Sequence, residues 1–355
     1  MCLKNSISLV IDTDNAFGMP VRDLDDGIAL IVALVSERVD VKAIVASACN
    51  CRAFEAVRNT KHLLEQFGRT DIPVGKGAEK PLSGDREAHH RFLEAKACGK
   101  GMAYWCNAPE IPQVDVSMLQ SGADVLIDSV RRNPHELVIV ALGSFTNIAE
   151  ALRKAPDIAP LIKEIVHMGG SFEPQEGELP FVWDTGDIPP EVWENTLRFN
   201  TWYDRQATAE VLQADIPVRF ITANVTSHFY LRNEHMRAIR SAAKGDLGEY
   251  LVRSIDPWLA WSIEQRNLVG AHMHDPLTIL ALLDESVCTY RSMDADIPSF
   301  LEGYELFPQK GGLLLKSTGS ATKLKVKVAV NLDTARAEQT LCNFLCRAAA
   351  LESNV

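Results

Sequence analysis

The chain has 355 residues, of which 46% are hydrophobic and 23% charged, as is ordinary for a globular protein with a large core. Its formal net charge of −11 and isoelectric point near 5.4 argue against nucleic acid or an anionic membrane as the main partner. The eight cysteines have no metal or disulfide spacing, no signal peptide is visible, and no apolar stretch approaches about 20 residues. These features predict a soluble, cytoplasmic protein with reduced thiols.

Apolar runs of strand length alternate with helical patterns along most of the chain. The run 7–11 precedes a helical pattern at 26–37, and the same order recurs at 41–47 and 52–67, and at 136–142 and 146–155. This alternation predicts an α/β fold with a mostly parallel, open twisted sheet and helices on both faces. The strands are continuously apolar, as parallel strands covered on both faces are.

Two stretches interrupt this rhythm. Residues 76–120 and 171–198 contain Gly, Pro, Trp and charge without a clean period, which predicts long loops or small insertions that wall a site. The stretch 230–310 is helix-rich. Because no linker, internal repeat or low-complexity tract is present, we expect a single domain over residues 1–355.

Aspartates crowd the junction between the first strand and the first helix, in the stretch DTDNAFGMPVRDLDDGIAL. Asp12 and Asp14 follow the strand, whereas Asp25 and Asp26 fall in the first turn of the helix. Helix capping explains one of these acids or two, for example Asp23 or Asp25 as the N-cap. Converging carboxylates repel one another unless a cation lies among them, and oxygen ligands without cysteine favour Ca²⁺ or Mg²⁺.

Other polar residues follow the later strands. Asn50 ends one strand, Leu142 and Gly143 end another, and a Met-Gly-Gly turn at 168–170 ends a third. Near the C-terminal third comes AHMHDPLTILALL, with His274 and Asp275 before a proline. The simpler interpretation of this stretch is a helix start with Asp275 as N-cap. His272 and His274 are then ordinary loop residues. They could also be zinc ligands, but the oxygen ligands elsewhere make zinc a poorer fit.

Taken in order, these motifs resemble those of the nucleoside hydrolases, which cleave the N-glycosidic bond of ribonucleosides with the help of calcium. The series runs from the D-x-D of the first strand and the paired Asp25-Asp26 to ASACN, VRNTKHLLE, LGSFTNIA, MGG, RFN, NVT and HDPL. Each motif alone is weak, but the order extends from residue 7 to about residue 345. The resemblance implies a Rossmann-like nucleoside hydrolase fold.

The resemblance also implies a role for each residue. Ca²⁺ would be bound by the side chains of Asp14, Asp26 and Asp275 and by the carbonyl oxygen of Leu142. Asp14 would deprotonate the calcium-bound water, and His274 would protonate or orient the leaving base. The nucleoside would be held by Asp25, Asn50, Met168 and Asn200. A pocket of carboxylates suits the positive charge of an oxocarbenium-like transition state. The family also implies a homodimer or homotetramer.

Three departures from the family pattern stand out. Ten residues, 15–24, separate the D-x-D motif from the aspartate pair, where the family usually has three. The loop 99–105, GKGMAYW, lacks the usual histidine. Arg198 stands where an acid normally meets the 5′-hydroxyl, and a guanidinium there would suit an anionic 5′ group. Alternatively, Arg198 faces solvent or pairs with Glu191 or Glu194.

Two other functions remain open at the level of sequence. A non-catalytic nucleoside-binding or regulatory protein would retain the same acids. A magnesium-dependent phosphatase of the haloacid dehalogenase type also opens with a strand and D-x-D, with Asp12 as its nucleophile, but leaves LGSFTN and HDPL unexplained. The sequence does not name the base, for which Trp105, Trp183, Trp193 and Tyr203 are candidate stacking partners.

Overall fold

A computed structural model of the protein describes residues 6–182, 199–296, 315–316 and 325–352. Within them a nine-stranded sheet has the order β10-β9-β11-β6-β5-β4-β1-β2-β3. Neighbouring strands from β11 to β3 are parallel, whereas β9 and β10 continue the sheet antiparallel. This confirms the predicted α/β class. The strands are β1 (Ile7–Thr13), β2 (Val39–Ala46), β3 (Val74–Lys76), β4 (Val138–Ala141), β5 (Glu164–Met168), β6 (Val218–Ile221), β9 (Cys288–Ala295), β10 (Leu315–Lys316) and β11 (Lys325–Leu332).

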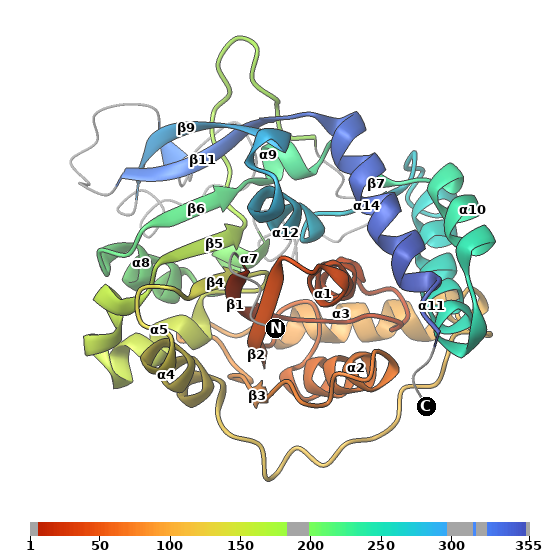
Figure 1. Cartoon of the computed structure of the whole chain (residues 1–355), viewed down its shortest axis with the longest axis horizontal. Coiled ribbons are helices and arrows are strands. Elements are labelled where there is room, and N and C mark those ends of the chain that lie inside the picture. The colour runs from red at the N-terminus through yellow and green to blue at the C-terminus, as the bar shows by residue number, and fades with distance from the viewer. Residues whose placement is uncertain (1–5, 183–198, 297–314, 317–324, 353–355) are drawn as a thin grey trace.

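Helices cover both faces of this sheet, as Figure 1 shows. On one side α4, α5 and α8 pack together, and on the other α1 packs against α12 and α14. The longer helices are α1 (Asp25–Val35), α2 (Ala53–Gln66), α3 (Glu87–Cys98), α4 (Gly122–Arg132), α5 (Thr146–Lys154), α8 (Arg205–Gln213), α10 (Asn233–Ala242), α11 (Gly245–Glu264), α12 (Pro276–Leu283) and α14 (Thr334–Ala349). Short elements are α7 (Phe199–Tyr203), α9 (Ala223–Thr226) and the antiparallel pair β7 (Tyr230–Leu231) and β8 (Ala271–His272).

The continuous apolar character of the strands follows from this double cover. Side chains alternate between the two faces of a strand, so in β1 Leu9 and Ile11 join the core beneath α1, α12 and α14. Val10 between them joins the core beneath α4, α5 and α8. The successive buried positions Leu9, Val10 and Ile11 are therefore all apolar, and polar residues follow where the strand reaches its carboxyl end.

The two irregular stretches differ from expectation in one respect. Residues 76–120 contain a complete helix, α3, which the sequence pattern missed because its apolar residues have no clean period. Only the first part of 171–198 lies among the described residues. The helix-rich region after residue 230 packs α10 and α11 against α14, so it shares a core with the sheet.

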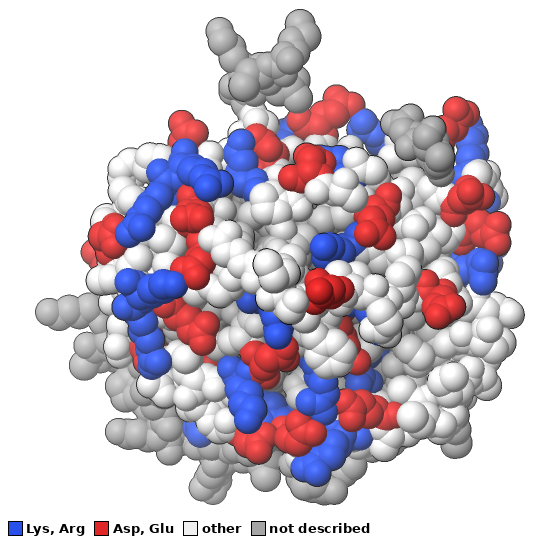
Figure 2. Space-filling model, turned by 90° about the horizontal axis from the view of Figure 1, so that it is seen from below, with Lys and Arg blue, Asp and Glu red and all other residues white. Residues whose placement is uncertain are grey.

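Surface charge is mixed in sign. Figure 2 shows Lys and Arg interspersed with Asp and Glu over one face of the molecule, without an extended basic patch on that face. None of the described helices is long and apolar enough to cross a membrane.

Candidate active site

A cavity of about 250 Å³ opens at the carboxyl ends of the parallel strands, where α/β sheets bind ligands. Its size approaches the lower end of the roughly 300–1,000 Å³ typical of small-molecule sites. One side is acidic and polar, and the other is largely aromatic and apolar. The polar side is lined by Asp14, Asp23, Asp25, Asp26, Asn50, Leu142, Met168, Asn200, His274 and Asp275.

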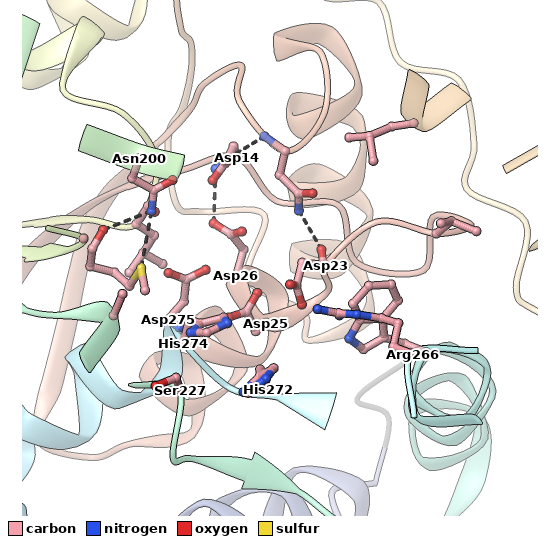
Figure 3. Close-up of a pocket in the computed structure, with 18 of the residues that line it drawn as sticks. Asp14, Asp23, Asp25, Asp26, Asn200, Ser227, Arg266, His272, His274 and Asp275 are labelled. Carbon is pink, nitrogen blue, oxygen red and sulfur yellow. Dashed lines mark hydrogen bonds between the residues drawn. The ribbon is translucent and has the colours of Figure 1, made fainter. Parts of the chain in front are cut away.

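Three carboxylates form the tightest cluster in this cavity. Asp25, Asp26 and Asp275 each offer an oxygen within 4.8 Å of the others, and all three side chains are buried. Asp14 lies beside this cluster, since its backbone N–H donates to Asp26 Oδ1 at 3.1 Å. Figure 3 shows the four aspartates converging although they come from the segment after β1, from α1 and from the start of α12. The fold thus brings residues 250 positions apart into one group.

Helix capping does not account for these acids. The N-cap of α1 is Leu24, which makes no capping bond with its side chain. Asp275 occupies the N-cap position of α12 but makes no capping bond with its side chain. Its Oδ1 is buried without a hydrogen-bond partner among the described residues. Neither Asp23 nor Asp25 is therefore the N-cap of α1, whereas Asp275 occupies the N-cap position of α12 as expected, without a capping bond from its side chain.

Burial makes the acidic cluster electrostatically costly. Desolvation is the largest cause and raises the pKa of Asp14 and of Asp25 to about 7. For Asp26 and Asp275 burial, reinforced by the neighbouring carboxylates, raises the pKa well above its ordinary value. Without a compensating cation, these groups cannot all ionise at neutral pH.

Backbone and hydroxyl donors hold the acids in place. Thr13 Oγ1 donates to Asp26 Oδ1 at 2.5 Å, and the N–H of Asn50 donates to Asp14 Oδ2 at 2.6 Å. The N–H of Asp275 donates to Asp25 Oδ2 at 3.0 Å. Each of these bonds joins two different elements of the fold, so the carboxylate positions are fixed by the frame of the sheet.

Asp12 lies behind the cavity rather than in its lining. Its carboxylate accepts from Ser47 Oγ at 2.8 Å and from Asn147 Nδ2 at 3.1 and 3.2 Å. Its carbonyl oxygen accepts the N–H of Leu142 at 2.8 Å. Asp12 therefore connects the ends of β1, β2 and β4 and helps to place the Leu142 carbonyl.

The carbonyl oxygen of Leu142 accepts a hydrogen bond from a side-chain amide in this structure. Asn200 Nδ2 donates to Leu142 O and, at 3.0 Å, to Met168 O. A carbonyl oxygen has a second lone pair, so Leu142 O can still serve as a metal ligand. The fold places Asn200 and Met168 together on the polar side, where the resemblance implied contacts to the nucleoside.

His274 lines the cavity between the acids and the aromatic side. Its Nδ1 is 2.8 Å from Thr226 Oγ1, and its ring stacks on His272 with centroids 4.9 Å apart. Burial lowers the pKa of His272 to about 3, so that ring is neutral. These contacts fix the orientation of His274 at the edge of the substrate space.

The aromatic side of the cavity comes from residues that the sequence did not single out. Trp258 and Trp261, three positions apart on α11, line it together with His89 and Phe92 of α3. Trp105 packs behind them, with ring centroids 6.4 Å from Trp258 and 6.1 Å from Trp261.

Of the expected stacking residues, neither Trp105 nor Tyr203 belongs to the cavity lining. Trp183, Trp193 and Arg198 lie outside the described residues.

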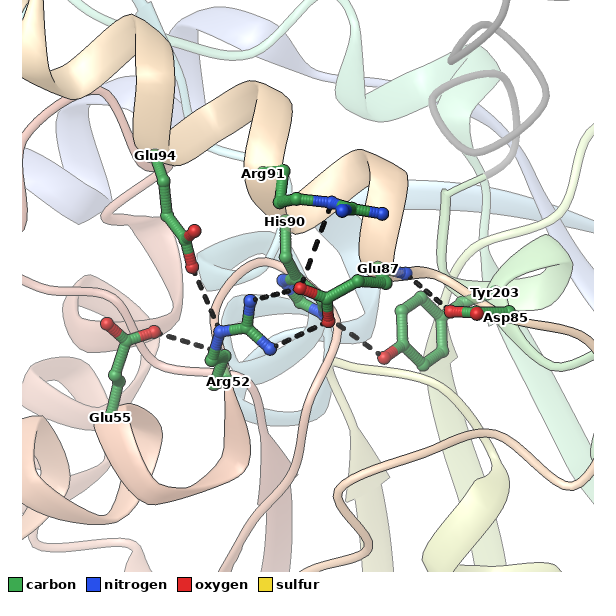
Figure 4. A network of polar contacts seen from close by, with 8 residues as sticks. All are labelled: Arg52, Glu55, Asp85, Glu87, His90, Arg91, Glu94 and Tyr203. Carbon is green, nitrogen blue, oxygen red and sulfur yellow. Dashed lines mark hydrogen bonds and ion pairs between the residues drawn. The ribbon is translucent and has the colours of Figure 1, made fainter.

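An ion-pair network fastens α3 to the rest of the site. Arg52, at the start of α2, meets Glu87 with two bonds of 2.9 and 3.0 Å and Glu94 with a third of 2.9 Å. Its own N–H donates to Glu55 at 2.9 Å. Figure 4 shows how this guanidinium joins the two helices. These bonds tie the start of α2 to α3, a helix that forms part of the cavity wall.

The inserted segment 15–24 also forms part of the wall. Val21 and Asp23 line the cavity, and the Asp23 carbonyl accepts Asn50 Nδ2 at 2.7 Å. Phe17 anchors the segment on α1, where a Cβ at Gly27 would come within 2.5 Å of the Phe17 Cβ. Only glycine at this position allows so close an approach.

The donor set fits a hard divalent cation. It consists of carboxylate and carbonyl oxygens, which Ca²⁺ and Mg²⁺ prefer, and no cysteine sulfur belongs to the described cavity lining. A cation would also give the buried Asp275 Oδ1 a partner and would offset the burial and mutual repulsion that raise the pKa values of the cluster.

Comparison with known proteins agrees with this geometry. A family model described as inosine-uridine preferring nucleoside hydrolase matches residues 9–339. A probable uridine nucleosidase 2 of Arabidopsis thaliana is 28% identical over 335 residues, which are 94% of this chain and 95% of that protein. The pyrimidine-specific ribonucleoside hydrolase RihA of Citrobacter koseri is 29% identical over 267 residues, 75% of this chain and 78% of that one.

Solved structures show the same fold. A purine-preferring ribonucleoside hydrolase from Gardnerella vaginalis superposes with a TM-score of 0.73 at 23% identity, covering 97% of this chain and 100% of that one. The family match leaves the phosphatase interpretation without support. The chain therefore belongs to the inosine-uridine preferring nucleoside hydrolase family, and it is an N-glycosyl hydrolase that acts on ribonucleosides.

Proposed function

We propose that the protein hydrolyses the N-glycosidic bond of a ribonucleoside with Ca²⁺ held by Asp14, Asp26, Asp275 and the Leu142 carbonyl. The observation that carries this proposal is the buried convergence of the carboxylates in a cavity of nucleoside size. When bound, Ca²⁺ would hold the attacking water beside the ribose diol and make that water more acidic.

Side chains of the protein would activate the water and bind the ribose. Asp14 is suited to accept the proton of the attacking water, because its buried carboxylate lies directly beside the cluster that would hold the ion. Asp25 belongs to the same cluster, and the Asp275 N–H occupies only part of its acceptor capacity. It can therefore also hold a ribose hydroxyl, together with Asn50, Met168 and Asn200.

Three other residues of the cavity lining act on the base. Trp258 and Trp261 offer aromatic surface for stacking. His274, oriented by Thr226, is placed to donate a proton to the leaving base as the C–N bond breaks. Water adds to the anomeric carbon, and the products are the free base and ribose.

The test is sugar release from a panel of nucleosides by the protein supplied with Ca²⁺. Uridine and cytidine come first, because two of the relatives are named for uridine or pyrimidine nucleosides, followed by inosine and adenosine. We expect reducing sugar to appear with at least one nucleoside, to stop on chelation and to return with Ca²⁺. Binding of nucleosides without sugar release would instead support the non-catalytic alternative.

A matched pair of variants tests the residue assignment. Asp26→Ala should lower turnover by orders of magnitude, because it removes an anionic ligand from the cluster. Asp157→Ala serves as control, since Asp157 is exposed and forms a surface ion pair with Arg131. Full activity of Asp26→Ala would refute the proposed ligand set.

A further inference from the structure

The wall of the substrate cavity that carries Trp258 and Trp261 also carries two positive charges. Lys96 of α3 and Arg266, which follows the end of α11, both belong to the cavity lining. The ammonium of Lys96 lies 5.6 Å from the ring centroid of Trp261, and the guanidinium of Arg266 lies 5.5 Å from that of Trp258. The two cations therefore flank the aromatic surface on which the base would stack.

The acids of the cavity lie on its other side. The carboxylates of the described lining all belong to the polar side, and they are Asp14, Asp23, Asp25, Asp26 and Asp275. Burial, hydrogen bonds and the neighbouring aspartates are the leading causes that set the pKa of the four clustered acids, and neither Lys96 nor Arg266 is among these causes.

The charge of Arg266 acts instead at the end of the cavity beside His274. There it adds to burial in lowering the pKa of His272, whose ring stacks on that of His274. Figure 3 shows the guanidinium of Arg266 pointing into the cavity. In the proposed function this is the space of the leaving base.

A base that fills this space displaces water from both cations. Lys96 and Arg266 are half-buried, so a ligand in the cavity can reach them. An ammonium has three N–H donors, a guanidinium has five, and neither has an acceptor, so other partners still leave donors for a ligand. A neutral apolar edge would leave such donors unpaired, which is unfavourable, whereas an anionic group accepts charge-assisted bonds from both.

We propose that Lys96 and Arg266 make the protein selective for ribosides whose base carries a negative charge. This inference rests on the proposed hydrolysis and names its substrate class. The bond cleaved is the same, because water adds to the anomeric carbon and the base leaves with the electron pair of the C–N bond. A ring carboxylate supplies the charge in nicotinate riboside, and an ionised oxo ring supplies it in xanthosine.

Two matched pairs of substrates test the proposal with the protein supplied with Ca²⁺. Nicotinate riboside differs from nicotinamide riboside by a carboxylate in place of an amide, and xanthosine differs from inosine by a ring that ionises near neutral pH. We expect the anionic member of at least one pair to have the higher kcat/KM, by roughly ten- to a hundredfold, as for one charge-assisted bond. The pair that shows the preference identifies the anionic group.

Variants of the two cations test the assignment. Lys96→Gln and Arg266→Gln should each reduce the preference, and the double variant should abolish it. The surface variant Arg131→Gln, which removes an exposed ion pair with Asp157, should retain it. Because each preference is a ratio of two rates on one protein, a loss of folded protein does not change it.

Three results would overturn the proposal. The first is equal or better hydrolysis of the neutral member in both pairs. The second is a preference that the double variant retains in full. The third is a change in the ratio of inosine 5′-monophosphate to inosine without a change in either pair, which would assign the cations to the 5′ end.

Failure of the proposed function has a different outcome, because no riboside would then release sugar. In that case calorimetric titration with nicotinate and nicotinamide decides. Tighter binding of nicotinate that is lost in the double variant supports an anion-selective cavity, and equal binding of the two bases overturns it.

Discussion

Replacing Asp25 by asparagine measures how much the buried negative charge of the acidic cluster lowers the free energy of unfolding, because asparagine packs like aspartate but carries no charge. The substitution keeps the size of the side chain and an oxygen that can accept the Asp275 N–H, now bonded at 3.0 Å. It removes one buried negative charge. We therefore expect the metal-free variant to be more stable than the natural protein above neutral pH, although it alters the active site.

The size of the effect follows from the pKa of Asp25. Burial, and next the charge of Asp26, raise it from 3.8 to about 7. A shift of about three units corresponds to about 4 kcal/mol, which is an upper limit because the neighbouring acids share the protons. Since the folded-state pKa is above the unfolded one, the cost is absent below about pH 4, grows between about pH 4 and 7 and is fully present above about pH 7. The variant should gain about 2–4 kcal/mol at pH 8 and almost nothing at pH 4.

Thermal unfolding with a chelator, between pH 4 and 8, measures this difference. For a chain of this length about 1 kcal/mol moves the midpoint by roughly 2 °C, so the expected gain at pH 8 is readily detected. Excess Ca²⁺ should reverse the order, because the natural protein binds the ion more tightly. The surface variant Asp157→Asn should show neither effect. Equal destabilisation of Asp25→Asn at pH 4 and pH 8 would refute the reasoning.

Three further expectations concern the leaving base, the inserted segment and the 5′ end. His274→Ala should slow the hydrolysis of purine nucleosides by roughly 10²–10⁴, and the hydrolysis of p-nitrophenyl riboside much less. Equal losses of rate on both substrates would make His274 a structural residue. Gly27→Ala should cost about 1–3 kcal/mol in urea unfolding, because the new methyl group meets Phe17; an unchanged midpoint would contradict that packing. If Arg198 binds the 5′ group of the substrate, the natural protein should have a higher kcat/KM for a nucleoside 5′-monophosphate than for the nucleoside, and Arg198→Glu should reverse that preference. A similar preference of both proteins for the plain nucleoside would exclude a contact between Arg198 and the 5′ group.

The sheet and the acidic cluster could be predicted because both follow from short-range rules. An apolar run that ends in Asp14 marks the carboxyl end of a buried strand, and the ends of neighbouring parallel strands meet at one edge. The same rule brought Asn50 and Leu142 to the cavity. Asp275 required the ordered resemblance, because nothing local shows that the start of α12 faces the end of β1.

The aromatic side could not be predicted in the same way. Trp258 and Trp261 occupy one face of α11, where the sequence pattern of a buried helix does not distinguish a core residue from a cavity wall. The helix α3 is tied to α2 by ion pairs with Arg52, and such pairing between distant residues leaves no periodic signal in the sequence. Trp105 and Tyr203 were plausible by composition, but both are buried outside the cavity lining.

The cluster also shows why this edge of the sheet can hold charges that the rest of the core excludes. Four buried aspartates would destabilise a loosely packed loop, yet here each accepts a donor or offers an oxygen to the cavity. Asp14 and Asp25 accept backbone N–H groups from residues that are distant in sequence, and Asp26 accepts from Thr13. These donors stabilise the ionised carboxylates. They also fix the orientation of each carboxylate, so that the oxygens cannot rotate away from one another. The fold thus maintains a charge arrangement that is costly alone and becomes favourable once a cation lies among the oxygens.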